Sequence, residues 1–529
     1  LIVVASLVSI GGLAYVVHRI GAAKREKREL AAAEFQRQEE INRREAVVAF
    51  AEPVAPSPEE AAEFVKVLTT FSAAARAENG PALAAHFDPE RLYDEILLQR
   101  GPGSGFGNNK KDRASFNAGF RNGAKNMIMS PFLNWKTTVI RRIRWSEDRN
   151  EAVIIATHRL FFKVEEEDVS MSIKTRWWFI HRPTGWKIYD IEDLDGGYRI
   201  TTFMAELTRA ENLPRLAELR DAITGLKDAM MGVVTGNVQA VEDGLARARR
   251  FPFPERMNAV LDILEAAAQL HRGAPDAALA LVDRAHQKNP DCPGMHSVRM
   301  ICLNFLQRYD EALKAGDAYF AQLGGDEDFY LQRGLALEGL GRTGEAAASY
   351  RKALDEYADS KDALDGLRRV LPKDKKAELY ERLAKASDPG KLCSELIDLA
   401  TKDNDFEAVN QYTIALRKFR PNDVRGITAQ IRRLVSDKKF ADAAAEMNGA
   451  LTRVKAEEQT QVVNSYLFAM LGAERAVEAY RSMPQARKSA AFRVLADEFE
   501  DIMSDDGTEE KHTRQLRDLI AIHKKEFPK

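Results

Sequence analysis

The chain of 529 residues has little cysteine, and the cysteines it has are not arranged for chemistry. They are Cys292, Cys302 and Cys393, and no two lie in a C-x-x-C pair. Three thiols cannot form a disulfide framework, so we expect them to pack as small apolar side chains. The sequence also lacks an N-x-S/T sequon. Nothing here indicates a disulfide-rich or glycosylated extracellular domain.

An excess of charge of either sign is also missing. The chain carries 78 basic and 80 acidic residues, a formal net charge of −2. A general nucleic-acid binder needs a basic surplus, so we expect no nucleic-acid partner. The glycine-rich segment 101–107 follows a predicted helix and leads into Asn108-Asn109-Lys110, which does not fit a P-loop. No histidine or acidic cluster has metal-ligand spacing, and we expect neither a metal nor a cofactor.

Long hydrophobic runs are scarce, and the one that stands out is Leu1 to Val17, LIVVASLVSIGGLAYVV. It is uncharged, near the minimum length for a bilayer span, and followed by a cluster of lysines and arginines. We expect a transmembrane anchor over 1–21 that meets the membrane through residues 1–17. The basic flank favours a cytoplasmic location for the rest, with a periplasmic side and a cleaved signal peptide as open alternatives. The first residue is Leu, which leaves open a start further upstream. Residues 22–56 predict a charged juxtamembrane helix and a Pro-rich linker.

Residues 57–203 predict an α+β domain. Ser57 followed by Pro58 and two glutamates is typical of a helix start, and Asn79-Gly80-Pro81 indicates its end. Two more helices are expected over 83–98 and 112–129. Four segments then alternate with period two, which predicts a four-stranded antiparallel meander. Those segments are 135–145, 152–164, 170–181 and 186–191.

The stretch RWWFIHRPTGWKIYDIEDLDGGYRIT, Arg176 to Thr201, resembles the cystatin-like cone superfamily named after nuclear transport factor two. The phrases HFDPERL and GGYRIT are also similar to periplasmic phospholipid-shuttle proteins. The resemblance covers roughly residues 57–203 and implies a cone-shaped α+β domain. The superfamily includes enzymes, lipid carriers and adaptors without activity, so the resemblance alone assigns no function.

Alternation along the predicted strands suggests which side chains would line such a cone. His158 alternates with apolar residues and is expected to face inward, and Asp190 and Glu192 alternate with Trp186. Ordinary core packing is the favoured interpretation of the histidine and the tryptophans. A pocket for a small apolar ligand, or an isomerase or hydrolase site at His158 with Asp190 or Glu192, are the alternatives. The candidate pocket residues are His158, Trp178, Trp186 and Asp190.

The most regular feature of the chain is a set of alanines, Ala278, Ala312 and Ala346, that recur every 34 residues. A period of this length in a helical sequence predicts a stack of helix pairs. The pattern resembles tetratricopeptide (TPR) repeats, in which a small residue in the second helix is followed by a bulky residue, an alanine and a closing proline. The middle repeat departs from this with Gly316 and Tyr319. The repeat-signature residues are Ala278, Val282, Ala285, Pro290, Ala312, Tyr330, Gly334, Ala346, Tyr350 and Ala353.

Weaker copies of the pattern extend the predicted array over residues 204–529. They occur around Ala240, Ala408 and Ala443, with a further pair over 459–483, and charge-rich helices near 489–503 and 508–527 are expected to cap the stack. First helices line the binding groove of such arrays. The corresponding residues here lack a carboxylate clamp, so an apolar or mixed protein segment is the expected ligand. The candidate groove residues are Ser297, Ile301, Asn304, Leu331, Leu335 and Glu338.

The sequence as a whole therefore predicts a multidomain, non-catalytic scaffold or adaptor. It would be tethered to a membrane and would bind a protein partner through its TPR-like array. Carriage of a lipid or small apolar ligand by the cone domain is the main alternative. An enzyme at His158 is the least favoured one.

Overall fold

The computed structural model describes residues 49–100, 110–127, 135–164, 167–196, 198–207, 215–290, 292–372, 376–483 and 510–526. The chain divides into two compact units, Leu1–Ser349 and Tyr350–Lys529. The predicted anchor, most of the juxtamembrane segment, the glycine-rich loop and the predicted cap near 489–503 lie outside the described residues.

No helix within the described ranges is long and apolar enough to cross a membrane. A span needs about 20 mainly apolar residues, whereas these helices bury one face and carry charge on the other. This finding contradicts the predicted single-pass membrane localisation, whose predicted span lies outside the described ranges.

The predicted antiparallel meander is confirmed, with a short fifth strand added. The strands are β1 (Trp135–Trp145), β2 (Glu151–Val164), β3 (Glu167–Arg182), β4 (Gly185–Asp193) and β5 (Tyr198–Arg199). They lie in the order β1-β2-β3-β4-β5. Together with the helices that lie between residues 58 and 207 they form what we call the sheet domain, residues 49–207. An α+β arrangement is therefore present in unit 1.

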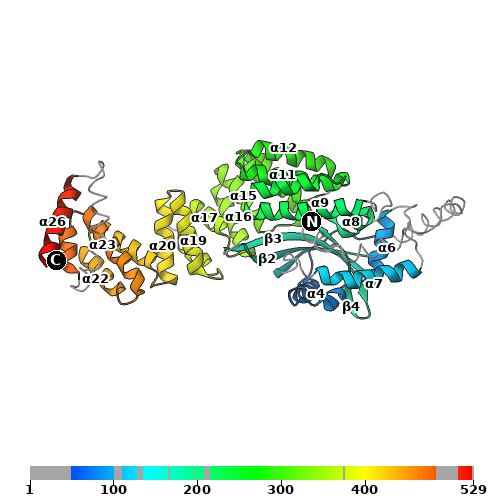
Figure 1. Cartoon of the computed structure of the whole chain (residues 1–529), viewed down its shortest axis with the longest axis horizontal. Helices are drawn as coiled ribbons and strands as arrows, with labels where there is room; N and C mark the ends of the chain where they lie inside the picture. The colour runs from blue at the N-terminus through cyan, green and yellow to red at the C-terminus, as the bar shows by residue number, and fades with distance from the viewer. Residues whose placement is uncertain are drawn as a thin grey trace. The chain divides into compact units, whose positions relative to one another are not determined.

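One face of the sheet, called the inner face, packs against α4 (Pro58–Arg76). The predicted start of this helix is confirmed, because Ser57 and Glu60 form a reciprocal capping box. Fully buried side chains from both elements build the core between them, including Phe64 and Phe71 from α4 and Trp177 and Phe179 from β3. Figure 1 shows α4 and α7 (Lys110–Met127) on this side of the sheet. On the other side, the outer face, it shows α9 (Leu216–Thr235), α11 (Glu255–His271) and α15 (Glu327–Gly339).

The helix expected over 83–98 is interrupted. It is replaced by α5 (Gly80–Ala84) and α6 (Pro89–Arg100), followed by α7 (Lys110–Met127). The break falls where the chain pairs with β4: the amide of Ile188 donates to the carbonyl of His86, and the amide of Asp88 donates to the carbonyl of Ile188. Backbone groups used in this bridge cannot also continue a helix.

The rest of unit 1 is a series of helix pairs. After α8 (Ile200–Leu207), the pairs are α9 (Leu216–Thr235) with α10 (Val238–Ala248), α11 (Glu255–His271) with α12 (Pro275–Lys288), and α13 (Gly294–Phe305) with α14 (Tyr309–Leu323). Then come α15 (Glu327–Gly339) and α16 (Thr343–Glu356), which runs past the division between the units. The sheet domain and these helices belong to one compact unit, so the predicted boundary near residue 203 falls inside it.

Unit 2 continues with helices only, among its described residues. They are α17 (Lys361–Val370), α18 (Lys376–Leu383), α19 (Pro389–Lys402), α20 (Phe406–Phe419), α21 (Val424–Ser436), α22 (Phe440–Ala450), α23 (Gln459–Gly472), α24 (Ala476–Ser482) and α26 (Glu510–Glu526). A single 3₁₀ turn, Ala456–Glu458, precedes α23. The pairs predicted around Ala408 and Ala443 and over 459–483 correspond to α19–α20, α21–α22 and α23–α24.

The recurring alanines sit where paired helices come closest. Ala278, Ala312 and Ala346 are fully buried on α12, α14 and α16. At Gly316 on α14, even an added Cβ would come within 2.8 Å of the Met300 side chain on α13. A larger side chain at this position would require the flexible end of Met300 to move aside.

Candidate functional site

The candidate groove residues lie on the first helices of two successive pairs, α13 and α15. All six are partly buried, whereas the alanines that define the repeat are completely buried. The apolar members, Ile301, Leu331 and Leu335, thus keep hydrophobic surface that a bound segment could cover. We treat this row as the candidate protein-binding surface of unit 1.

A polar bridge joins the two helices within this row. The side-chain amide of Asn304 donates to the backbone carbonyl of Gln332 at 2.9 Å and to its side-chain oxygen at 3.0 Å. The side-chain oxygen of Asn304 is buried and has no hydrogen-bond partner. Buried acceptors are normally paired, so this oxygen is an exception within the row.

His158 faces inward, into a packed and neutral environment. Its Nδ1 lies 2.9 Å from the hydroxyl of Thr138, and its Nε2 lies 2.9 Å from the hydroxyl of Thr175. Its ring stacks on Trp135, with centroids 4.2 Å apart. Burial lowers the pKa of His158 to about 3, so the ring is neutral at ordinary pH. Both ring nitrogens are engaged in the core, as expected of a structural histidine.

Asp190 and Glu192 lie on the other face of the sheet from His158. Ile188 and Ile191 are both part of the inner core, while Asp190 pairs with Trp178 on the outer face. A register shift between Trp178 and Phe179 inserts Tyr189 as an extra residue, which reverses the alternation that starts at Trp186. The structure therefore does not bring His158 together with either carboxylate.

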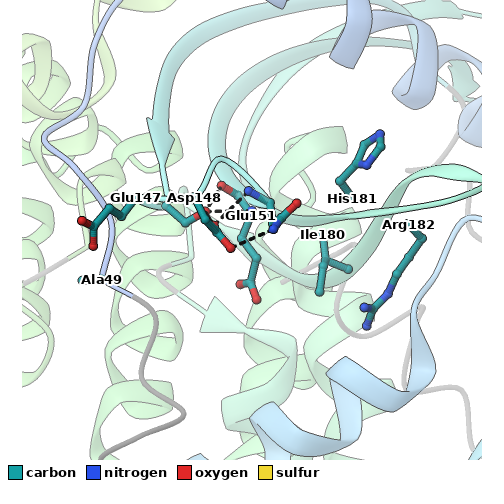
Figure 2. Close-up of a pocket in the computed structure, with 9 residues that line it drawn as sticks. Ala49, Glu147, Asp148, Glu151, Ile180, His181 and Arg182 are labelled. Carbon is teal, nitrogen blue, oxygen red and sulfur yellow. Dashed lines mark hydrogen bonds between the residues drawn. The ribbon is translucent and has the colours of Figure 1, made fainter.

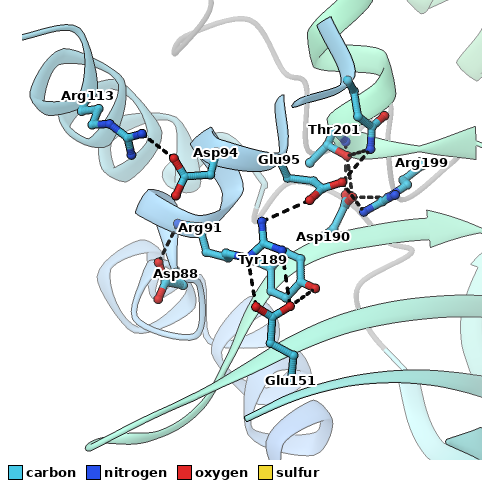
Figure 3. A network of polar contacts seen from close by, with 11 residues as sticks. Asp88, Arg91, Asp94, Glu95, Arg113, Glu151, Tyr189, Asp190, Arg199 and Thr201 are labelled. Carbon is cyan, nitrogen blue, oxygen red and sulfur yellow. Dashed lines mark hydrogen bonds and ion pairs between the residues drawn. The ribbon is translucent and has the colours of Figure 1, made fainter. Parts of the chain in front are cut away.

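The outer face near Asp190 holds a network of charged groups (Figure 3). Arg91 on α6 contacts Glu151 at 3.1 Å, and the hydroxyl of Tyr189 donates to the same carboxylate at 2.6 Å. Arg199 pairs with Asp190 and, at 3.0 Å, with Glu95. Burial raises the pKa of Asp190 to about 6, although Arg199 and Thr201 oppose the rise.

Each cation of this network is paired with carboxylates and also lies over an aromatic ring. Arg199 lies over the ring of Trp178, 4.0 Å from its centroid, and Arg91 lies over Tyr189 at 4.5 Å. Asp190 accepts hydrogen bonds from Thr201 and Arg199. Such mutual pairing fastens α6 and the start of α8 to the sheet. The network thus has an evident structural role.

The remaining pocket candidate, Trp186, belongs to the rim of the inner core. Its ring packs on Phe64 with centroids 5.2 Å apart, and its indole N–H donates to Glu63 at 2.9 Å. The four residues proposed as one pocket are thus divided between both faces of the sheet and the rim.

An open groove of about 780 Å³ lies beside the β1–β2 turn (Figure 2). Its lining includes Asp148, whose carboxylate accepts hydrogen bonds from the Ser146 hydroxyl at 2.7 Å and from the Asn150 amide at 3.0 Å. These bonds close the turn, in which Arg149 has a φ of 56°. The acidic side chain therefore shapes the loop.

Sequence reasoning missed a second contact region, between the outer face and the first turns of α13 and α15. Lys174 on β3 is nearly buried among the carboxylates of Asp195, Asp326 and Asp328. Burial alone would lower the pKa of Lys174, but these carboxylates raise it well above its usual value. On the strand, Lys174 looks like an ordinary polar residue of the alternation. The one local signal was the acidic run 326–328.

No protein-family model matches the chain, and no curated protein matches it. Similar solved structures include the C-terminal part of a TPR repeat-containing protein from Cytophaga hutchinsonii, at 16% identity, covering 48% of this chain and 98% of that one with a TM-score of 0.31. A TPR protein from Parabacteroides merdae is 15% identical, with coverages of 47% and 99% and a TM-score of 0.28. PilF of Pseudomonas aeruginosa is 18% identical, with coverages of 39% and 97% and a TM-score of 0.27. Scores this low carry no argument about function, and the helical-repeat description rests on the helix pairs themselves.

Proposed function

We propose that this protein is a non-catalytic scaffold whose TPR-like array binds a protein partner. The supporting observation is the row of partly buried apolar side chains on α13 and α15. A mixed or apolar segment would cover Ile301, Leu331 and Leu335. Stacked helix pairs commonly use such surfaces for protein recognition. The sheet domain, which we propose to be a cystatin-like cone, then acts as a structural base.

Substitution of the groove tests this proposal on the full chain. The partner would be identified by crosslinking in the source cells and then purified, so that the affinity of the pair is measured with defined components. Replacing both Leu331 and Leu335 by Asp should weaken binding at least about thirtyfold, because losing the apolar contacts at the centre of an interface costs about 2 kcal/mol or more.

A matched control separates loss of binding from loss of folding. Ile414 on α20 is also apolar and is 37% exposed, but it lies on a second helix. Ile414→Asp should bind like the wild type. If the double groove variant retains full affinity, or if no protein crosslinks to the chain, this function is refuted.

The alternative of an apolar-ligand carrier gains no support from the described sheet domain. Its inner face is filled by its own side chains: Phe64 lies against Phe179 with ring centroids 5.0 Å apart, and Phe71 against Trp177 at 5.6 Å. Native mass spectrometry of the full chain would reveal a retained small molecule and would reopen this alternative.

A further inference from the structure

The outer face of the sheet meets the repeat helices through two buried cations. Arg159 on β2 contacts Glu327 at 2.6 Å, with both side chains about nine-tenths buried. Lys174 on the neighbouring strand pairs with Asp328 and lies 3.7 Å from Asp195 and 4.0 Å from Asp326. Its side chain is 6% exposed. Two basic side chains of the sheet domain are therefore held by a row of acids at the start of α15.

The repeat itself holds one of these acids in place. One oxygen of Asp326 caps α15 by accepting from the amide of Phe329 at 2.9 Å. The other accepts from the hydroxyl of Tyr319 on α14 at 2.6 Å. The carboxylate is thus oriented by neighbouring repeat helices and does not depend on Lys174 for its position. A preoriented, buried carboxylate is a ready partner for a cation.

Apolar and backbone contacts surround the charges. Ile155 on β2 and Leu194, just beyond β4, share a core cluster with Met300 and Phe329 of the repeats. The amide of Gly294, at the start of α13, donates to the carbonyl of Leu194 at 3.0 Å. The sheet domain therefore reaches the N-terminal ends of two first helices, the kind of surface on which repeat arrays hold ligands.

We propose that Arg159 and Lys174 make the sheet domain an intramolecular ligand of the array. They occupy an acidic site at the start of α15, and the charge pairing fixes the position of the sheet on the helices. This end of the first-helix surface is therefore closed to partners in the intact chain. Binding by other proteins is left to the groove further along α13 and α15. The proposal concerns the chain's own contacts and stands whether or not the scaffold function holds.

The reason to assign positioning to the charges is energetic. A buried ion pair gains little over an apolar pair of the same shape, because removing its charges from water is costly. Leaving one member without its partner, by contrast, is severely unfavourable. A sheet docked one residue out of register would separate Lys174 from Asp328 and leave both charges buried without this partner, so the charges select a single arrangement.

Hydrogen exchange on the full chain, followed by mass spectrometry, tests the proposal. In Lys174→Met, Asp326 and Asp328 lose their cation while the aliphatic part of the side chain is retained. We expect amides in the first turns of α15 and α13 to exchange at least tenfold faster. Amides of α4, on the inner face, should exchange at the wild-type rate. Unchanged exchange in α15 would overturn the proposal.

A variant in which the two charges are exchanged distinguishes loss of the ion pair from general unfolding. Lys174→Asp combined with Asp328→Lys restores a pair of opposite charges, and protection of α15 should return to within about threefold of the wild type. Suppose that Lys174→Met is folded and its α15 amides exchange faster than in the wild type. The proposal is then also contradicted if the double variant does not regain protection at α15. If Lys174→Met does not fold, Asp328→Asn is used in its place. Amides at the start of α15 should then exchange two- to fivefold faster than in the wild type. No acceleration of exchange there would refute the proposal. As a control, Arg308→Met breaks a surface pair with Glu311, and exchange in α15 should not change.

Discussion

The two faces of the sheet, formed by alternate residues of the same strands, differ in the kind of contact that they make. On the inner face, aromatic and aliphatic side chains pack against α4, and His158 there is neutral and hydrogen-bonded. On the outer face, charged side chains predominate: one network fastens α6 and α8, and a second meets the repeats at Lys174. The inner face supplies the core of the sheet domain, and the outer face determines what the domain is attached to.

The largest effect should come from two neighbouring tryptophans that lie on opposite faces. Trp177 is fully buried and donates to Thr175 at 2.6 Å, whereas Trp178 is 8% exposed under Arg199. We expect Trp177→Ala to destabilise the sheet domain by about 3–5 kcal/mol, and Trp178→Ala by clearly less. All five tryptophans lie between residues 135 and 186, so tryptophan fluorescence during urea unfolding reports on this domain. Equal losses of stability in the two variants would contradict this difference between the faces.

The contact of the outer face with the repeats can be tested by adding a single methyl group at Gly294. A Cβ at Gly294 would lie 2.5 Å from the Cα of Asp195, a backbone atom that cannot move aside alone. Gly294→Ala should therefore cost about 1–3 kcal/mol in urea unfolding. Gly344→Ala is the control, since its Cβ would meet nothing within 4 Å. A harmless Gly294→Ala would show that the contact is loose.

The neutral histidine of the inner face should make stability depend on pH. The folded-state pKa of His158 is about 3, against an ordinary value of 6.5. Below pH 6.5 His158 is protonated in the unfolded chain but stays neutral in the folded chain. Its contribution to the free energy of unfolding is therefore fully present above pH 6.5 and is lost as pH falls. Relative to His158→Gln, the wild type should lose about 1.4 kcal/mol per pH unit between pH 6 and 4. Parallel unfolding curves for the two proteins would contradict a buried neutral histidine.

The smallest effect concerns the start of the helix that covers the inner face. Ser57 and Glu60 exchange hydrogen bonds at 3.2 and 2.9 Å. Ser57→Ala should cost about 1 kcal/mol and speed hydrogen exchange in the first turn of α4. Ser360 precedes α17 without a side-chain capping bond, so Ser360→Ala should leave the first turn of α17 unchanged. Similar responses at both sites would show that the capping box contributes little.

Local patterns made much of the fold predictable. The capping residues at Ser57, the four period-two segments and the 34-residue spacing of alanines all depend on neighbours in sequence, and the structure confirms the elements that they predict. The interruption between α5 and α6 was not predictable in this way. It results from pairing with Ile188, about a hundred residues away along the chain.

The candidate site shows the same division. The groove positions of α13 and α15 could be placed by counting from the repeat alanines, and their function stays a prediction. Asp190 and Trp186 lie on opposite faces of the sheet, contrary to the predicted grouping, because one inserted residue, Tyr189, reverses the alternation along β4. Alternation identifies the face of a side chain only while the register is unbroken.

The sequence by itself determined which segments become helices, strands and repeats, since capping, periodicity and residue size act over a few positions. The tertiary structure decided which face of the sheet meets which helices. It also placed Lys174 of one strand beside Asp328 of a repeat, 154 positions further along the chain. Long-range charge pairing and close packing produce these contacts, and neither leaves a periodic trace in the sequence.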